Sequence, residues 1–249
     1  MQIKKLFIAL GIVLPLHMQG QNFLIKDAPE VIESYVNQFN REDNELYKQD
    51  IPNCGASDFL RKNIPFFECP DKELEKTYYF RWWTYRKHIK KTPDGFVITE
   101  FLPDVPWAGK YNTISCAANH HFYEGRWLRN AEILSDYASF WFSGSGNPRL
   151  YSFGAADAIY NYYLIHNDKM LLADLYPKLK DNFAKWEEEK RDSTGMFWQV
   201  DDRDGMEMSV SGHLSEGGRG YRPTINSYMY GEAVALAKIA SIVDRDMEA

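Results

Sequence analysis

The sequence predicts a mainly α fold built from consecutive pairs of antiparallel helices. Apolar residues recur every three or four positions through most of the 249-residue chain, which is the period of a helix that buries one face. Short connections alternate with long ones, and hydrophobic residues make up 45% of the chain, enough to fill a core between several helices. Helix hairpins in series build either an α-solenoid or an α/α toroid.

Residues 1–21 have the parts of a secretory signal peptide. Two lysines precede an apolar run over residues 6–16, and Gly20 offers a small residue at a cleavage point. The run is too short to remain as a membrane anchor. We therefore expect an exported protein, periplasmic or extracellular, whose mature chain of residues 22–249 has no membrane span.

Turn-forming residues divide the first half of the mature chain into its elements. The segment 28–43 places five apolar residues on one helical face, and 71–91 continues the helical period with many aromatic residues. A Pro-Asp-Gly turn at 93–95 follows. Residues 95–103 are then predicted to form a short strand, and 103–113, rich in proline and glycine, a loop.

The second half of the chain repeats the pattern of paired helices and long connections. The segment 144–149, Gly-Ser-Gly-Asn-Pro-Arg, breaks one pair from the next, and the Thr224 hydroxyl can cap the last helix. The expected elements are helices over 115–125, 126–143, 152–168 and 169–191, a strand over 195–200, and a last helix from about residue 224.

Charge and cysteine content exclude several classes of partner. The net charge is −6 and the longest basic stretch is 86–91, which speaks against a nucleic-acid partner. No His/Cys spacing predicts zinc, and Arg203 interrupts the ligand pattern of an EF-hand, so no metal and no cofactor are expected. Cys54 and Cys69 enclose a short loop, a spacing compatible with a disulfide in an oxidising compartment.

The segment after Trp198 is unusually acidic, with four carboxyl groups between Asp201 and Glu207. It could be a solvated turn, a cation site, or a carboxyl directed at a sugar. Glu207 lies between two methionines, and apolar surroundings raise the pKa of a carboxyl, which keeps a general acid protonated near neutral pH. Asp201 or Asp204 could instead pair with Arg203.

Aromatic residues make up 15% of the chain, and they either fill the helical core or present rings to a sugar. At helical spacing Tyr79, Trp82 and Trp83 cannot all lie on one core-facing stripe, so some must face a pocket, a neighbouring helix or solvent. Arg81 beside them can donate hydrogen bonds to sugar hydroxyls.

Four blocks, in this order, resemble the α/α-toroid glycosidases: YYFRWWTYRKHI, VPWAGKYNTISCAANHHFYEGRWL, FWQVDDRDGMEMSVSG and YRPTINSYMYGEAVALAKIA. The most similar groups are glycoside hydrolase family 63 and the mannosylglycerate-hydrolase-like domain, with trehalases as more distant relatives. The resemblance covers residues 70–245. It implies an incomplete (α/α)6 toroid, because a ring of six hairpins needs about twelve helices and about seven or eight are expected here.

The resemblance also assigns residues to an inverting, exo-acting hydrolase of an oligosaccharide or glycoside. Those families carry the general acid in a Gly-apolar-acid-any-Ser loop, here residues 205–209. Glu207 is therefore the expected acid, although the relatives often have Asp at this position, and Asp204 is the alternative. The family's base, a glutamate of the C-terminal half, has no counterpart in this chain, so residues 22–249 are expected to be a partial toroid domain, an N-terminal fragment that lacks the C-terminal half. The expected substrate-binding residues are Tyr79, Arg81, Trp82, Trp107, His121, Trp198, Gln199, Arg203, Arg222, Asn226 and Tyr228.

Two other functions fit the same sequence. A non-catalytic, carbohydrate-binding helical surface protein also needs aromatic residues and export, but it needs no protonated carboxyl. A toroid-fold lyase or epimerase would use a histidine or tyrosine base, which gives the central role to His120 or His121.

Overall fold

The computed structural model describes residues 28–205, 215 and 217–243, and the expected signal peptide lies outside them. The described residues form eight α-helices and two antiparallel sheets of two strands each, which confirms the mainly α prediction. The helices are α1 (Ala28–Glu42), α2 (Ala56–Asn63), α3 (Lys72–His88), α4 (Ser115–Gly125), α5 (Glu132–Phe142), α6 (Ala155–His166), α7 (Lys169–Lys190) and α8 (Pro223–Ile242). The strands are β1 (Ile89–Thr92), β2 (Gly95–Ile98), β3 (Trp198–Gln199) and β4 (Gly220–Tyr221).

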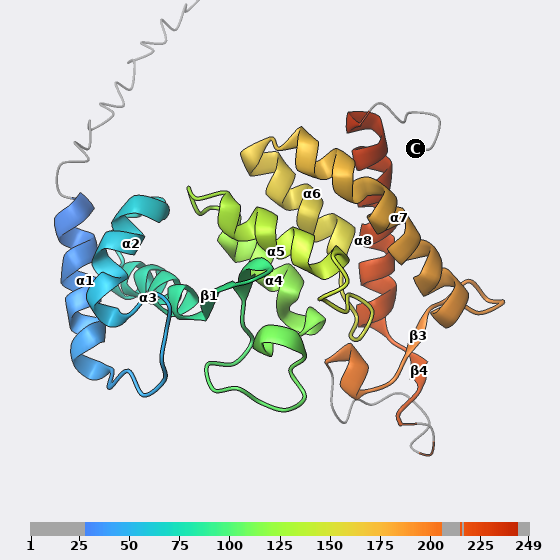
Figure 1. Cartoon of the computed structure of the whole chain (residues 1–249), viewed down its shortest axis with the longest axis horizontal. Coiled ribbons are helices and arrows are strands. Elements are labelled where there is room, and N and C mark those ends of the chain that lie inside the picture. Colours follow the sequence, from blue (N-terminus) through green and yellow to red (C-terminus); the bar gives the residue numbers. More distant parts are fainter. Residues whose placement is uncertain (1–27, 206–214, 216, 244–249) are drawn as a thin grey trace, which may run out of the picture.

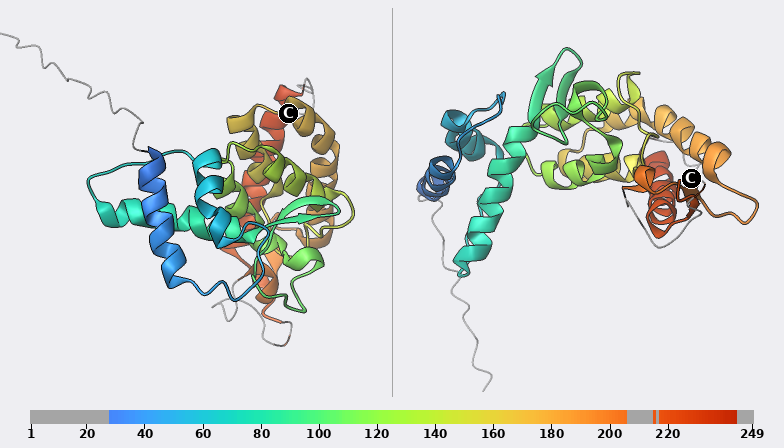
Figure 2. Two further views of the ribbon diagram at one scale, coloured as in Figure 1. Left: turned by 60° about the vertical axis from the view of Figure 1, so that its left-hand side comes forward. Right: turned by 90° about the horizontal axis from the view of Figure 1, so that it is seen from below.

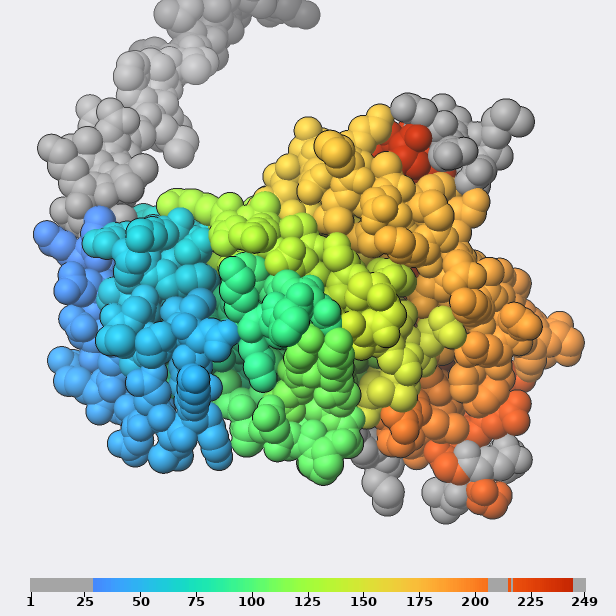
Figure 3. Space-filling view, in the orientation of Figure 1, coloured from blue at the N-terminus to red at the C-terminus, as the bar shows by residue number. Residues whose placement is uncertain are grey.

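The helices from α4 onward are arranged in two layers. Helix α4 contacts α6 and α6 contacts α8, while α5 contacts α7. Each successive hairpin thus contributes one helix to each layer, which is how helix hairpins stack in α/α toroids and solenoids. The chain follows an open arc from α1 to α8 (Figures 1 and 2), and successive segments lie side by side along the molecule (Figure 3). No helix of the described part of the chain has the length and apolar character needed to cross a membrane.

Several stretches differ from the sequence prediction: the helix expected over 126–143 begins at Glu132, and the strand expected over 95–103 ends at Ile98. The helix expected over 71–91 ends at His88, because Ile89–Thr92 pairs with Gly95–Ile98 in a hairpin around the predicted turn. The segment between Cys54 and Cys69, expected as a loop, contains α2, whose Ala56 and Leu60 are buried four residues apart on one face. Both cysteines are free thiols.

The N-terminal helices α1 to α3 are joined by aromatic packing and one buried arginine. Trp83 of α3 faces α1, where its indole N–H donates to Asn40 at 2.8 Å. Arg86, completely buried on the same helix, donates to Gln49 at 2.8 Å and to the carbonyl oxygen of Ile51 at 2.5 Å, and also to Asn53. Because a buried guanidinium needs acceptors, these bonds hold the connection between α1 and α2 against α3.

Candidate functional site

The loops that lead into α4, α6 and α8 meet at one end of the helical layer. The backbone N–H of Tyr151, before α6, donates to the hydroxyl of Ser115 at the start of α4, at 3.1 Å. The backbone N–H of Ser152 donates to the carbonyl oxygen of Arg203, in the acidic loop before α8, at 2.8 Å. The sequence places these loops far apart, and the antiparallel hairpins bring them together.

Asp204 anchors the acidic loop to this end. Its carboxyl is buried, and the Ser152 hydroxyl donates to Oδ1. Burial raises the pKa of Asp204, and the nearby hydroxyls of Ser152 and Thr224 oppose that shift. Gly205 follows with φ of 66°, and a Cβ there would lie 3.2 Å from the sulfur of Cys116. The loop therefore enters the segment 206–214 from a fixed position, and Glu207 lies outside the described residues.

Arg222 is the second anchor of the acidic loop, and it corrects one expected pairing. Its guanidinium pairs with Asp201, whereas Arg203 approaches Asp202 at 3.6 Å. Arg222 is 2% exposed and also donates to the carbonyl oxygens of Gln199, at 3.3 Å, and of Gly218. Burial lowers the pKa of Arg222. Arg222 is thus held by groups of the loop itself.

The start of α8 and the strand β3 are joined by side-chain amides. Helix α8 begins at Pro223, so Arg222 takes the N-cap position expected for Thr224, and no side chain caps the helix. Asn226 bonds both the N–H and the carbonyl oxygen of Phe197, at 2.9 and 2.8 Å. Gln199 is buried, and its side-chain amide oxygen Oε1 accepts from the backbone N–H of Val200 at 3.0 Å. These amides fix the backbone on either side of the acidic loop.

Two tryptophans at the loops differ in what covers their rings. The ring of Trp198 has the Lys190 ammonium 3.8 Å and the Arg219 guanidinium 3.9 Å from its centroid. Cations therefore occupy positions over the ring at which a sugar would stack. Trp107 is 60% exposed and rests edge-on against Phe101, with ring centroids 6.0 Å apart. Trp107 offers the more accessible aromatic surface.

Arg81 and His121 lie together at a separate polar cavity of about 200 Å³ between α3, α4 and the end of β2. Arg81 pairs with Glu124 at 2.5 Å. Burial, and secondarily the neighbouring histidines His88 and His120, lower the pKa of His121 to about 3. His121 is therefore neutral at physiological pH and a weak base. The lining residues are Arg81, Thr84, Tyr85, His88, Ile98, Thr99, Glu100, His121 and Glu124.

The remaining candidates are distributed between the core and the loop end. Tyr79 and Trp82 are buried in the core, where the Tyr79 hydroxyl donates to the carbonyl oxygen of Phe67 at 2.6 Å. Tyr228 is half-buried on α8, its ring 3.8 Å from where a Cβ of Gly154 would lie. The sequence predicts the helix α3, but it does not indicate which of the α3 aromatic residues are enclosed in the core.

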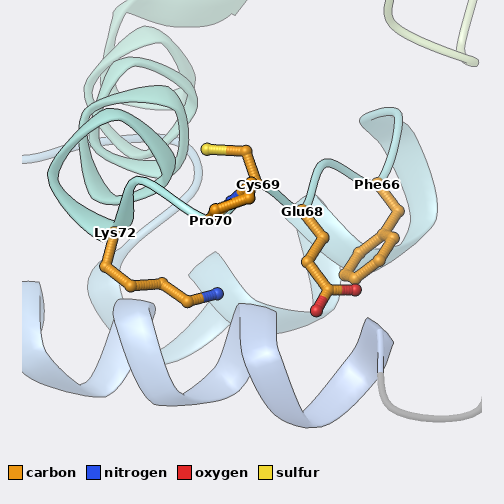
Figure 4. Close-up of a pocket in the computed structure, with 5 residues that line it drawn as sticks. All are labelled: Phe66, Glu68, Cys69, Pro70 and Lys72. Atoms are coloured by element: carbon orange, nitrogen blue, oxygen red, sulfur yellow. The ribbon is translucent and has the colours of Figure 1, made fainter.

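A larger hollow of about 400 Å³ lies beside the segment that leads into α3, and none of the sequence candidates lines it (Figure 4). Lys72, at its edge, donates to Glu75 at 2.9 Å. The residues around this hollow are Phe66, Glu68, Cys69, Pro70 and Lys72.

Glu100 is one of the residues at the polar cavity that the sequence analysis did not single out. It directly precedes the loop that carries Trp107, and its backbone N–H donates to the carbonyl oxygen of Asn112 at 3.0 Å, which closes that loop. The available signal was a carboxyl placed after a buried strand and before a tryptophan-bearing loop.

The chain is similar to known glycosidase domains. The family model described as mannosylglycerate hydrolase MGH1-like glycoside hydrolase domain matches residues 110–249. A solved structure of a protein named sialidase is 40% identical over 88% of this chain, with a TM-score of 0.81, and the match covers 20% of that protein's chain. The chain therefore spans about a fifth of the solved chain it resembles, and no curated protein matches it. The resemblance indicated by the four sequence blocks is confirmed.

Proposed function

We propose, because this chain belongs to the family of mannosylglycerate hydrolase MGH1-like glycoside hydrolase domains, that it supplies the general acid of an inverting, exo-acting glycosidase. The general base comes from a segment outside this chain. The observation that carries the proposal is the family match over residues 110–249, which includes the whole acidic loop and its anchors. The substrate is an oligosaccharide or glycoside.

Glu207 is the proposed acid. It follows the anchored pair Asp204 and Gly205, whose burial and backbone conformation fix where the segment begins. Glu207 would protonate the glycosidic oxygen while a carboxylate on the opposite face of the sugar activates water, with roughly 6.5–9.5 Å between the two carboxyl groups in an inverting enzyme. Trp107, Arg203 and other residues of the loops would surround the sugar.

The test is Glu207→Gln in the full-length protein, assayed on aryl glycosides with poor and with good leaving groups. Removing a general acid should lower turnover by about 10²–10⁴ for a poor leaving group such as the phenol of a phenyl glycoside. Turnover of 2,4-dinitrophenyl glycosides should fall much less, because that leaving group departs without a proton. Glu188→Gln, an exposed position on α7, is the matched control. Unchanged hydrolysis of the poor leaving groups by the Glu207 variant would remove the assignment.

Asp204→Asn separates the two carboxyl candidates. If Asp204 anchors the loop through Ser152, its variant should lose stability and lose activity equally on both kinds of leaving group. If Asp204 is itself the acid, the loss should be confined to the poor leaving groups. The anomer released first, followed by NMR, tests inversion directly.

The second candidate function, a non-catalytic glycan-binding protein, is favoured by one observation, the exposed ring of Trp107. Calorimetry that detects glycan binding by a full-length protein that cleaves none of the glycans would support it. The lyase or epimerase alternative has less support with His121 as its base, because a histidine with a pKa of about 3 abstracts protons poorly. A lyase would also release unsaturated, ultraviolet-absorbing products.

Export to the periplasm or the extracellular space belongs to the proposal, since it follows from the composition of residues 1–21 alone. N-terminal sequencing of the protein secreted by its host should find a mature chain that begins near Gln21. A protein that retains Met1 and stays in the cytoplasm would contradict it.

A further inference from the structure

We propose that the polar cavity between α3 and α4 binds a neutral sugar unit, and that the carboxylate of Glu100 accepts hydrogen bonds from its hydroxyl groups. The choice of a sugar as the ligand rests on the proposed function. The charge and the acceptors of the site are observed independently of it.

The cavity is built from three parts of the fold. Helix α3 contributes its C-terminal half, from Arg81 to His88, α4 contributes His121 and Glu124, and the end of β2 leads into Glu100. A volume of about 200 Å³ is below the ~300 Å³ at which sites for drug-sized ligands begin. It suits a single small polar ring rather than a longer segment of glycan.

The carboxyl group of Glu100 is open to the cavity, since its side chain is 27% exposed. Within the described residues no group donates a hydrogen bond to its carboxylate, and the nearest ionisable partner is Nε2 of His121, at 3.7 Å. Burial alone raises the pKa of Glu100, and His121 is neutral, so the two side chains do not form an ion pair at physiological pH. The carboxylate oxygens therefore have no donor in the described part of the chain, and sugar hydroxyls would donate to them in place of water.

The charge of the cavity selects among sugars. The guanidinium of Arg81 is neutralised by Glu124, and burial lowers the pKa of His88 as it does that of His121. When its carboxyl group is ionised, Glu100 gives the cavity a net negative charge. A uronic or sialic acid would bring a second carboxylate against it, whereas a neutral or amino sugar meets no repulsion.

The loop that carries Glu100 is held in a conformation that few sequences adopt. Tyr111 and Asn112 have φ of 60° and 61°, in the left-handed region that non-glycine residues usually avoid. The Asn112 amide donates to the carbonyl oxygens of Phe101 and Pro103, at 2.5 and 2.9 Å, and accepts from Val105 at 3.1 Å. Strain of this kind persists where the surrounding structure fixes a functional geometry, and here it fixes the loop that carries both Glu100 and Trp107.

The experiment is isothermal titration calorimetry of the full chain with glucose, mannose, galactose, glucosamine and glucuronate. We expect at least one neutral hexose to bind, and glucuronate to bind about tenfold more weakly or not at all. Glu100→Gln should weaken binding of that hexose by about tenfold, which corresponds to about 1.4 kcal/mol, because a charged acceptor is replaced by a neutral amide. Glu188→Gln, exposed and distant in sequence, should bind as the parent does.

Separate measurements show where the hexose binds and whether the Glu100 variant is folded. The ring ¹⁵N signals of His121 should shift when the hexose is added, which places it in this cavity. The melting temperature of Glu100→Gln should match the parent, because only the backbone N–H of Glu100 closes the loop. The proposal is overturned if no neutral hexose binds, if the Glu100 variant binds as tightly as the parent, or if glucuronate binds as well as glucose.

The outcome is separable from that of the proposed function. Glu207→Gln should keep the hexose affinity of the parent, because the described residues that line this cavity belong to α3, α4 and the end of β2, and Glu100 supplies the proposed acceptor. Normal turnover by Glu207→Gln together with lost hexose binding by Glu100→Gln would refute the assigned acid and leave the sugar site standing.

Discussion

Glu232 is a fully buried carboxyl in the middle of α8, and its burial predicts a specific pH dependence of stability. Its Oε1 accepts a hydrogen bond from the backbone N–H of Asp157, in the first turn of α6, at 3.1 Å. Among the described residues Oε2 has no hydrogen-bond partner. Burial raises the pKa of Glu232 from 4.5 to about 8. The folded protein therefore carries a proton on Glu232 at neutral pH that the unfolded chain releases.

The sign and size of the effect follow from proton linkage. Between pH 4.5 and about 8 the folded state binds more protons than the unfolded state, so stability falls as pH rises through this range. The slope for one group is about 1.4 kcal/mol per pH unit, or about 3 kcal/mol between pH 5 and pH 7. In Glu232→Gln the acceptor for Asp157 remains and the side chain never ionises, so this loss disappears.

The assay is urea unfolding of the parent and of Glu232→Gln at pH 5 and pH 7, followed by tryptophan fluorescence. The difference between their free energies of unfolding should move by about 3 kcal/mol in favour of the glutamine variant on going from pH 5 to pH 7. Glu188→Gln should show no such change. Parallel pH profiles for the parent and the Glu232 variant would refute the reasoning, because they would mean that Glu232 titrates alike in the folded and unfolded states.

Two further substitutions test the anchors of the fold. Arg86→Met should lower the free energy of unfolding by about 3 kcal/mol, since it leaves buried acceptors without a donor, whereas Arg61→Met, on the surface, should change it by less than about 0.5 kcal/mol in the same urea assay. Gly205→Ala should lower the free energy of unfolding by about 1–2 kcal/mol because of its left-handed backbone, and further because the new Cβ contacts Cys116. Gly144 also has a positive φ but open space around it, so Gly144→Ala should lose only the backbone contribution. Equal losses at the two glycines would contradict the contact with Cys116.

Local sequence patterns were sufficient for most of the helical framework. The helix expected over 115–125 coincides with α4, and that over 28–43 differs from α1 by one residue, because apolar spacing and turn residues act within a few positions. The error at 89–91 has a local cause too, since four residues of hairpin pairing outweighed a continuing helical pattern. The incomplete-toroid arrangement came from the resemblance, and the domain boundary of 22–249 remains a prediction.

The sequence by itself determined that this chain forms helix hairpins and that carboxyl groups gather in the loop before its last helix. Only the tertiary structure decided which of those carboxyl groups have ion-pair or hydrogen-bond partners, and which residues those partners are. Asp201 pairs with Arg222 and Asp204 with Ser152, 52 positions away, and Glu100 meets His121 across a cavity. The physical reason is that burial and charge partners are set by residues distant in sequence, which antiparallel helices bring together and which no local period encodes.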